Sequence, residues 1–317
     1  MRYINFTVVR SSRAMRGDQS TMNTVTFEAI NRCIYCGVNN AVAELSDEHI
    51  IPLSLNGMMI LPSSSCKLCA AVTSKFELVC AREIYGQFRR RYSLKTRRPK
   101  KRQTEVTVEL TTVDGNYGVV VKPDEIPTLM PFFYLGPAGC LHEPPNLIPT
   151  WERATVRVKD LGIKDPTLLN RIGPTSSFYS QSVKCDIDNF ARLCAKIGHG
   201  FAVSLFGEGS FEAWLPPYIL GKNNNLAFVV GASPSPPSTG EATEPPSNWK
   251  VAHKLNWSVY ETSAYGPLLA IDMHLFPSFG QPPILAIVGK ISPSLHEALI
   301  TNPKQFNNPA LKLSVKT

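Results

Sequence analysis

Apolar residues recur every three or four positions in two long stretches of the chain, and this spacing predicts two helices. The first helix is predicted from Lys67 to Tyr92, and Pro99 prevents its continuation. The second is predicted from about Asp186 to Phe206, where Asp186 or Asp188 is available as the N-cap. The basic residues opposite the apolar stripe of the second helix are interpreted as a solvated face: Arg192, Lys196 and His199.

Alternating apolar and polar residues predict strands in the rest of the chain. The segments 106–110 and 119–121 flank the turn Asp114-Gly115-Asn116 and are predicted to pair as a hairpin. The segment 123–149, rich in Pro, Gly and aromatic residues, is interpreted as a loop over buried aromatic side chains, and the Pro/Ser-rich segment 232–248 as a flexible loop. Further strands are predicted at residues 3–9, 154–158, 226–230, 268–276 and 284–288. The mixture predicts an α+β protein.

The composition of the 317 residues is that of an ordinary globular protein, with 43% hydrophobic residues. No apolar run approaches the roughly 20 residues needed to cross a bilayer, and the N-terminus lacks the apolar region of a signal peptide. We therefore expect a soluble cytoplasmic protein with no membrane partner. Four of the eight cysteines have no regular spacing, which favours a reducing compartment over a disulfide framework: Cys80, Cys140, Cys185 and Cys194.

The other four cysteines form two Cys-x2-Cys pairs, Cys33 with Cys36 and Cys66 with Cys69, separated by 29 residues. Each short pair can place two sulfurs on one ion, and four thiolates are a common ligand set for structural zinc. The sequence therefore predicts one tetrahedral zinc ion bound by all four cysteines.

Between the two pairs the chain reads Asp47-Glu48-His49-Ile50-Ile51-Pro52, and Gly57 follows. An acidic residue and a His before Ile-Ile-Pro, framed by two cysteine pairs of which the second opens a helix, resembles the zinc-containing HNH endonucleases. The resemblance covers roughly residues 32–92. It implies a ββα-metal unit in which a short hairpin carries the His, a helix closes the metal site, and zinc ties hairpin to helix.

The resemblance implies a hydrolase that cuts phosphodiester bonds, with DNA as the expected partner. His49 is the candidate base, because an imidazole can take a proton from water near neutral pH. Glu48 is the candidate ligand for a catalytic magnesium or manganese ion, since these ions prefer oxygen ligands and offset the charge of the transition state. The segment 195–200 and the late stretch 275–283 are also similar to bacterial HNH-containing proteins, which implies a bacterial or phage origin.

Two positions depart from the HNH pattern. Ala70 stands where family members commonly carry an Asn or His that helps to hold the catalytic metal, and the segment 61–65 lacks the Asn that orients the catalytic His. Replacement ligands would have to come from the following helix, where Thr73 and Glu77 lie four residues apart on one face. A solvated helix charge is an equally good interpretation of Glu77.

Nine basic residues and no acidic residue lie between Arg89 and Arg102, and without them the chain has 24 basic and 25 acidic residues. The net charge of +8 is thus concentrated directly after the HNH-like unit. This placement favours contact with a phosphate backbone over a solvated tether. The candidate contact residues are Arg89, Arg90, Arg91, Lys95, Arg97, Arg98, Lys100, Lys101 and Arg102.

The expected organisation is an N-terminal arm (1–32), a zinc-knuckle HNH unit (33–92), a basic connector (93–102) and a larger mixed α/β domain (103–317). Three functional hypotheses fit it. The first is a metal-dependent HNH endonuclease with a structural zinc. The second is a non-catalytic zinc-dependent nucleic-acid-binding protein with a degenerate HNH site. In the third, the C-terminal domain senses a signal or docks a partner and thereby controls the nuclease.

Overall fold

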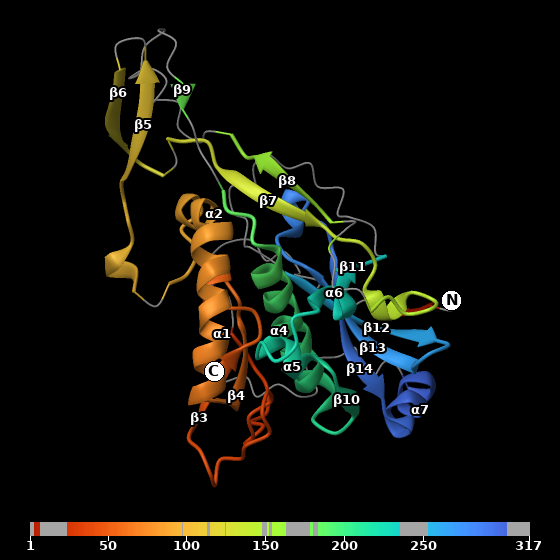
Figure 1. Ribbon diagram of the computed structural model, residues 1–317. Coiled ribbons are helices and arrows are strands. Elements are labelled where there is room, and N and C mark those ends of the chain that lie inside the picture. Colours follow the sequence, from red (N-terminus) through yellow and green to blue (C-terminus); the bar gives the residue numbers. More distant parts are fainter. Residues whose placement is uncertain are drawn as a thin grey trace, which may run out of the picture.

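The computed structural model describes residues 3–6, 24–96, 98–112, 115–123, 125–147, 151, 154–162, 178–179, 183–234 and 253–302. In this part of the chain, a six-stranded antiparallel sheet lies on one side of a long central helix, and the unit with the two cysteine pairs lies on the other (Figure 1). The mixed content of helices and strands confirms the predicted α+β class.

The large sheet has the strand order β1-β12-β13-β14-β10, and β11 also pairs with β14. Its two central strands are buried along most of their length, as expected of strands that are covered on both faces. The strands of this sheet are β1 (Tyr3–Phe6), β10 (Phe211–Ala213), β11 (Val230–Ala232), β12 (Lys254–Thr262), β13 (Gly266–His274) and β14 (Ile284–Ile291).

The central helix α4 (Ile187–Phe206) begins at Asp186, whose side chain accepts a hydrogen bond from the backbone N–H of Asn189 at 3.0 Å. The predicted helix and its N-cap are therefore confirmed. The interpretation of a solvated face is wrong for Lys196 and His199, which are 0% and 1% exposed, whereas Arg192 is half-buried. One face of α4 packs on β13 and β14, and the face that carries Lys196 and His199 packs on the zinc-knuckle unit.

The zinc-knuckle unit is a ββα arrangement extended by one short strand. β3 (Leu45–His49) pairs antiparallel with β4 (Met59–Cys66), and β2 (Val25–Thr26) pairs parallel with the other edge of β4. The segment 52–57 turns the chain between β3 and β4. A Cβ at Gly57 would lie 1.8 Å from the carbonyl oxygen of Ile51, so only glycine fits this turn.

Helix α1 (Lys67–Val79) continues from β4 and is followed by one π-helical turn (Cys80–Ile84) and by α2 (Gly86–Arg91). The single helix predicted from Lys67 to Tyr92 is thus present but carries one widened turn. The buried residues Phe76, Ile84 and Phe88 join it to the main hydrophobic core.

The described part of the chain also contains a three-stranded sheet in the order β6-β5-β9, the strand pair β7-β8 and three short α-helices. The hairpin predicted around Gly115 is confirmed, and β7 lies in the segment that we interpreted as a loop. Phe133 of β7 is buried and stacks on Phe190 of α4 with ring centroids 4.1 Å apart, so the prediction that these aromatics are packed holds. The elements are β5 (Val106–Thr112), β6 (Gly115–Val121), β7 (Leu129–Tyr134), β8 (Thr155–Asp160), β9 (Phe178–Tyr179), α5 (Leu215–Ile219), α6 (Leu226–Val229) and α7 (Pro293–Thr301).

The strand predicted at 226–230 is wrong, because residues 226–229 form the short helix α6 and the strand begins at Val230. Leu226 and Val229 are both buried and lie three residues apart, which is typical of a helical turn. A short apolar run is equally compatible with a strand, so the sequence pattern alone did not distinguish the two. The strands predicted at 154–158, 268–276 and 284–288 are confirmed as β8, β13 and β14. The predicted strand at 3–9 is confirmed over residues 3–6, which form β1, and its residues 7–9 lie outside the described residues. Most of the predicted flexible loop at 232–248 also lies outside them.

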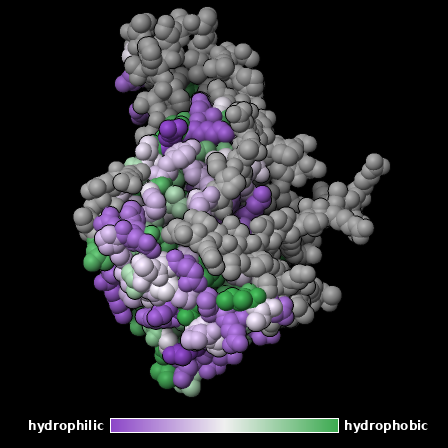
Figure 2. Space-filling view, turned by 90° about the vertical axis from the view of Figure 1, so that its right-hand side faces the viewer, coloured by the Kyte–Doolittle hydropathy of each residue, from purple (hydrophilic) through white to green (hydrophobic). Residues whose placement is uncertain are grey.

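On the face shown in Figure 2, hydrophilic and hydrophobic areas are mixed among the described residues. No described helix is both long enough and apolar enough to cross a membrane.

Two glycines of α4 provide a matched test of how tightly this helix packs. A Cβ at Gly198 would lie 2.8 Å from the Cβ of Ala286 in β14, whereas a Cβ at Gly200 would lie at an ordinary 3.6 Å from Ile50. We expect Gly198→Ala to lower the free energy of unfolding by about 1–3 kcal/mol through overpacking. Gly200→Ala should raise it by up to about 1 kcal/mol through helix propensity. Urea denaturation of both variants measures the difference, and equal effects would contradict this packing.

Candidate metal centre and the carboxylate pair beside it

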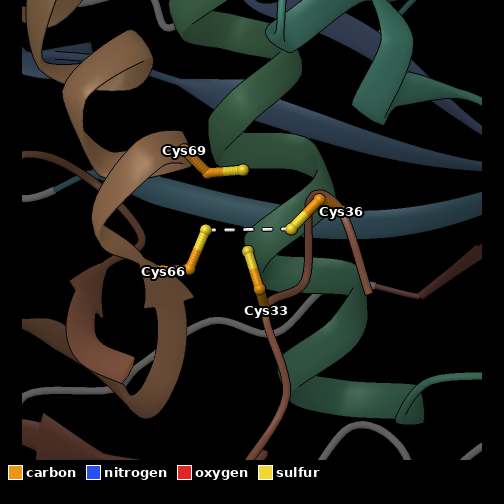
Figure 3. Close-up of side chains that lie close together, drawn as sticks. All are labelled: Cys33, Cys36, Cys66 and Cys69. Atoms are coloured by element: carbon orange, nitrogen blue, oxygen red, sulfur yellow. Dashed lines mark hydrogen bonds between the residues drawn. The ribbon is translucent and has the colours of Figure 1, made fainter. Parts of the chain in front are cut away.

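The four cysteines of the two Cys-x2-Cys pairs converge on one point. Their sulfur atoms all lie within 4.8 Å of one another, and the sulfurs of Cys36 and Cys66 are 3.7 Å apart (Figure 3). Four sulfurs about 2.3 Å from one zinc ion would stand about 3.8 Å apart at the edges of a tetrahedron. The cluster therefore has the size and the ligand type of a closed structural zinc site.

The local fold explains why the cysteines meet. Cys33 and Cys36 lie in a tight turn that ends at Gly37, which has a φ of +78° and whose N–H donates to the carbonyl of Cys33 at 2.8 Å. Cys66 is the last residue of β4, and Cys69 lies in the first turn of α1. A metal bound here ties the first turn to the junction of strand and helix.

The protonation state of the cysteine thiols depends on whether a metal ion is bound. Burial raises the pKa of the Cys33 thiol and also that of Cys69. Burial acts in the same direction on Cys66, but hydrogen bonds from Cys69 and from the neighbouring thiols outweigh it and lower the Cys66 pKa. Without metal, most of these buried thiols would keep their protons, whereas a coordinated zinc ion deprotonates its thiol ligands.

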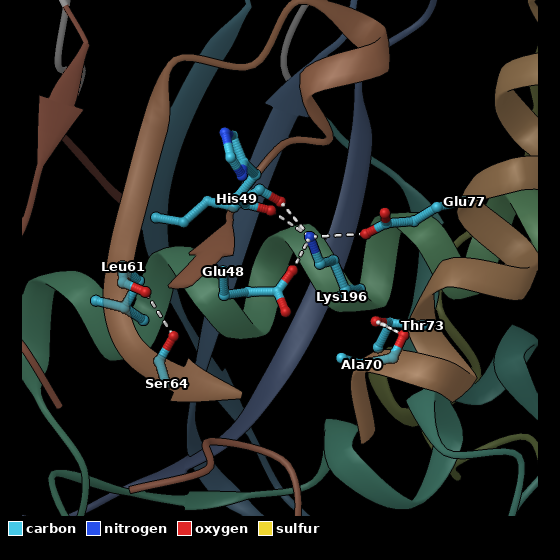
Figure 4. A network of polar contacts seen from close by, with 9 residues as sticks. Glu48, His49, Leu61, Ser64, Ala70, Thr73, Glu77 and Lys196 are labelled. Carbon is cyan, nitrogen blue, oxygen red and sulfur yellow. Dashed lines mark hydrogen bonds and ion pairs between the residues drawn. The ribbon is translucent and has the colours of Figure 1, made fainter. Parts of the chain in front are cut away.

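A second polar cluster lies beside the cysteines, centred on Lys196 of α4. Its ammonium forms ion pairs with Glu48 Oε1 at 2.6 Å and with Glu77 Oε1 at 2.9 Å, and it donates to the backbone carbonyls of His49 and Ile50 (Figure 4). The ammonium thus joins β3, the segment after it, and α1. Two predicted ligands of a catalytic metal, Glu48 and Glu77, do meet, but a lysine side chain lies between them.

The charge of Lys196 is maintained in the core. Complete burial acts to lower the pKa of this ammonium, but the nearby charges of Glu48 and Glu77 and their hydrogen bonds raise it overall. A buried cation with two anionic partners is the arrangement that electrostatics permits in a protein interior. Lys196 therefore stays protonated at neutral pH.

His49 does not share this cluster through its side chain. Its carbonyl oxygen faces the Lys196 ammonium, whereas its imidazole points away (Figure 4). His49 and Glu48 are neighbours on one strand, and adjacent strand residues project to opposite faces. The candidate base and the candidate metal ligand are therefore separated by the backbone of β3.

The remaining candidates for the metal site play structural parts. Thr73 is buried, and its hydroxyl donates to the carbonyl of Ala70 at 3.3 Å within α1. Asn56 adopts a left-handed conformation with a φ of +67° at the end of the turn before Gly57. Neither residue contacts the Lys196 ammonium in the described structure.

The basic segment is used in two ways. Arg89 donates to the carbonyls of Ser54 and Ala81 at 2.6 and 2.8 Å, and Arg91 is buried and donates to Gly162. These two side chains hold the fold together. Arg90 and Arg102 are half-buried, Arg97 lies outside the described residues, and the exposed members are Lys95, Arg98, Lys100 and Lys101.

Sequence reasoning missed the role of α4 in this site. Lys196 stands alone among small and apolar residues in Cys194-Ala195-Lys196-Ile197-Gly198, and His199 hydrogen-bonds through Nε2 to the carbonyl of Ile34 at 2.7 Å. Burial lowers the pKa of His199 to about 4, so this ring is neutral at neutral pH. The available signal was that α4 is apolar around most of its circumference, because the few polar groups on such a helix must be paired inside the protein.

Comparison with protein-family models, with curated proteins and with solved structures gives no match for this chain. Inferences about its function therefore rest on the geometry of the two clusters and on the distribution of charge.

The cysteine cluster predicts one tightly bound zinc ion per chain. Replacing one ligand, as in Cys69→Ser, should abolish stoichiometric zinc and lower the stability of the zinc-knuckle unit, since metal binding and folding are coupled. Cys185→Ser, outside the cluster, is the matched control and should retain the metal. Elemental analysis of the purified proteins provides the measurement, and full zinc content in Cys69→Ser would contradict the four-cysteine site.

Proposed function

We propose that this protein is a zinc-stabilised nucleic-acid-binding protein whose HNH-like unit does not cut its target. The supporting observation is the position of Lys196, a fully buried ammonium between the two carboxylates that a catalytic divalent ion would need. The proposal adopts the second of the three hypotheses.

Catalysis by an HNH mechanism would require three things near Glu48: a divalent cation, a water molecule and the imidazole of His49. The Lys196 ammonium occupies the position that the divalent cation would need, and the imidazole of His49 points away from that position. Lys196 also has no exposed surface from which to contact a phosphate itself. A substrate phosphodiester therefore has no access to the cation in this arrangement.

Binding is supported by exposed positive charge on the outer side of the zinc-knuckle unit. Lys95, Arg98, Lys100 and Lys101 are exposed after α2, and the outer face of α1 and the π-helical turn adds Lys67, Lys75 and Arg82. The acidic residues of this helical region are already paired, Glu77 with Lys196 and Glu83 with Lys184. Figure 1 shows α1 and the segment after α2 on the side of the molecule away from the large sheet.

Positive charges spaced along such a surface bind a phosphate backbone by releasing its counterions, and they do so without sequence readout. The contact of Arg89 with the carbonyl of Ser54 keeps the start of this segment beside the turn between β3 and β4. The basic surface is therefore held next to the zinc-knuckle unit by the fold. We favour double-stranded DNA as the ligand.

The rival function is a metal-dependent nuclease, and one specific observation favours it. Glu48 and Glu77 come from separate elements, β3 and α1, and still converge on one cation. If Lys196 withdrew, the pair would offer oxygen ligands to magnesium or manganese. Cleavage assays separate the two functions.

The binding surface is tested by charge removal at matched positions. Lys95→Gln, Lys100→Gln and Lys101→Gln combined should weaken binding to a labelled DNA duplex and reduce the slope of log K against log salt by up to about three. The control combines Lys222→Gln, Lys254→Gln and Lys290→Gln, three exposed lysines outside this surface. Fluorescence anisotropy at several salt concentrations gives both slopes, and equal losses in the two triple variants would rule out a localised interface.

Absence of cleavage is tested with supercoiled plasmid. The wild-type protein, with zinc bound and DNA retained, should leave the plasmid intact with magnesium, with manganese and with EDTA, and His49→Ala should behave in the same way. Metal-dependent nicking by the wild-type protein that disappears in His49→Ala would instead establish the nuclease.

A further inference from the structure

The ligand set around the Lys196 ammonium is that of a hard metal ion. Two carboxylate oxygens, from Glu48 and Glu77, and two backbone carbonyl oxygens, from His49 and Ile50, all face one point. Carboxylate and carbonyl oxygens are the ligands that magnesium, manganese and calcium prefer. The point is largely enclosed, since the side chains of Lys196, Glu48 and Glu77 are 0%, 9% and 23% exposed.

The charges of this site are matched better by a divalent cation than by an ammonium. Glu48 and Glu77 together carry two negative charges, and Lys196 offsets one of them. The distances from Nζ to Glu48 Oε1 and to Glu77 Oε1 are 2.6 and 2.9 Å, whereas a magnesium ion would bind oxygen at about 2.0–2.1 Å. An ammonium of this size and an enclosed metal ion cannot occupy the same point together.

We propose that the Lys196 side chain is a built-in substitute for a divalent cation, which closes a metal site formed by β3 and α1. Because the ammonium is attached to α4, it is always present and does not depend on the metal concentration. The magnesium or manganese ion that an HNH unit would require therefore does not fit this structure. This inference goes beyond the proposed function and does not depend on nucleic-acid binding.

The substitution also accounts for residues that the sequence left unexplained. Compared with the HNH pattern, this chain lacks a metal ligand at position 70, where it has Ala70, but it retains Glu48. Glu77 follows on the same helix as Ala70. The two acidic residues are required whichever cation lies between them, because a buried lysine without partners would lose its charge or unfold the core. An additional ligand at position 70 is required only for a metal.

The proposal predicts that shortening the lysine creates a metal site. Zinc-loaded Lys196→Ala should bind one manganese ion per chain at least roughly tenfold more tightly than the wild-type protein, and its midpoint of thermal unfolding should rise with manganese concentration. The wild-type midpoint should not respond. Manganese is the probe because its bound and free forms are distinguished by electron paramagnetic resonance and because it competes poorly for the thiolates that hold zinc.

The control variant carries both Lys196→Ala and Glu77→Gln, which removes one carboxylate from the same cavity. It should lose the manganese affinity of the single variant by at least about tenfold and show no stabilisation by the metal. Equal manganese binding in the two variants would place the ion elsewhere and overturn the proposal.

Two further outcomes also decide against it. Manganese binding by the wild-type protein that is as tight as binding by Lys196→Ala would show that the ammonium does not exclude the metal. A Lys196→Ala protein that remains unfolded with manganese present would show that the ion cannot replace the ammonium. Plasmid cleavage by the wild-type protein would refute the proposed function but would leave these manganese measurements to be judged separately.

Discussion

The structure depends on the neutralisation of one buried charge. An ammonium removed from water costs several kcal/mol unless anionic partners and hydrogen bonds replace its hydration, and truncating one member of a buried ion pair typically costs about 3–5 kcal/mol. Glu48, Glu77 and the carbonyls after β3 provide that replacement for Lys196. These partners belong to the N-terminal unit, whereas the lysine belongs to the helix on which the large sheet is built. Each half therefore supplies partners for a buried charge of the other.

The predicted zinc site and the ammonium perform related tasks at neighbouring positions. The cysteine cluster would hold the first turn of the unit to the junction of β4 and α1, and the ammonium holds β3 and α1 to α4. His199, one helical turn after Lys196, extends the same contact to Ile34 between the first two cysteines. A unit of this size has a small core of its own, and such units commonly rely on metals or on partners for stability. Here the partner is another part of the same chain.

The local sequence pattern was sufficient to predict features that depend on a single element or on neighbouring elements. The cysteine spacing predicted the cluster, helical periodicity predicted α4 and its cap, and alternation predicted the pairing of β5 and β6. The failures occurred where tertiary contacts decide. Lys196 and His199 do share one face of α4, as the periodicity indicated, but that face contacts a unit more than 140 residues earlier in the chain. The spacing of apolar residues in α4 and in the N-terminal unit does not show that these two distant segments bury one another. In the same way, the short strands β10 and β11 form by pairing with β14, which their own sequences do not reveal.

The π-helical turn at Cys80–Ile84 has a geometric consequence for the basic segment. One residue more than an α-helix would use is accommodated there, so α2 is rotated by about 100° relative to a straight continuation of α1. That rotation directs Arg89 toward the carbonyl of Ser54 and Arg91 toward that of Gly162. The π-helical turn thus sets the rotation of α2 about the common helix axis. This rotation determines that Arg89 and Arg91 point inward and bind backbone carbonyls, while neighbouring basic side chains remain exposed to solvent.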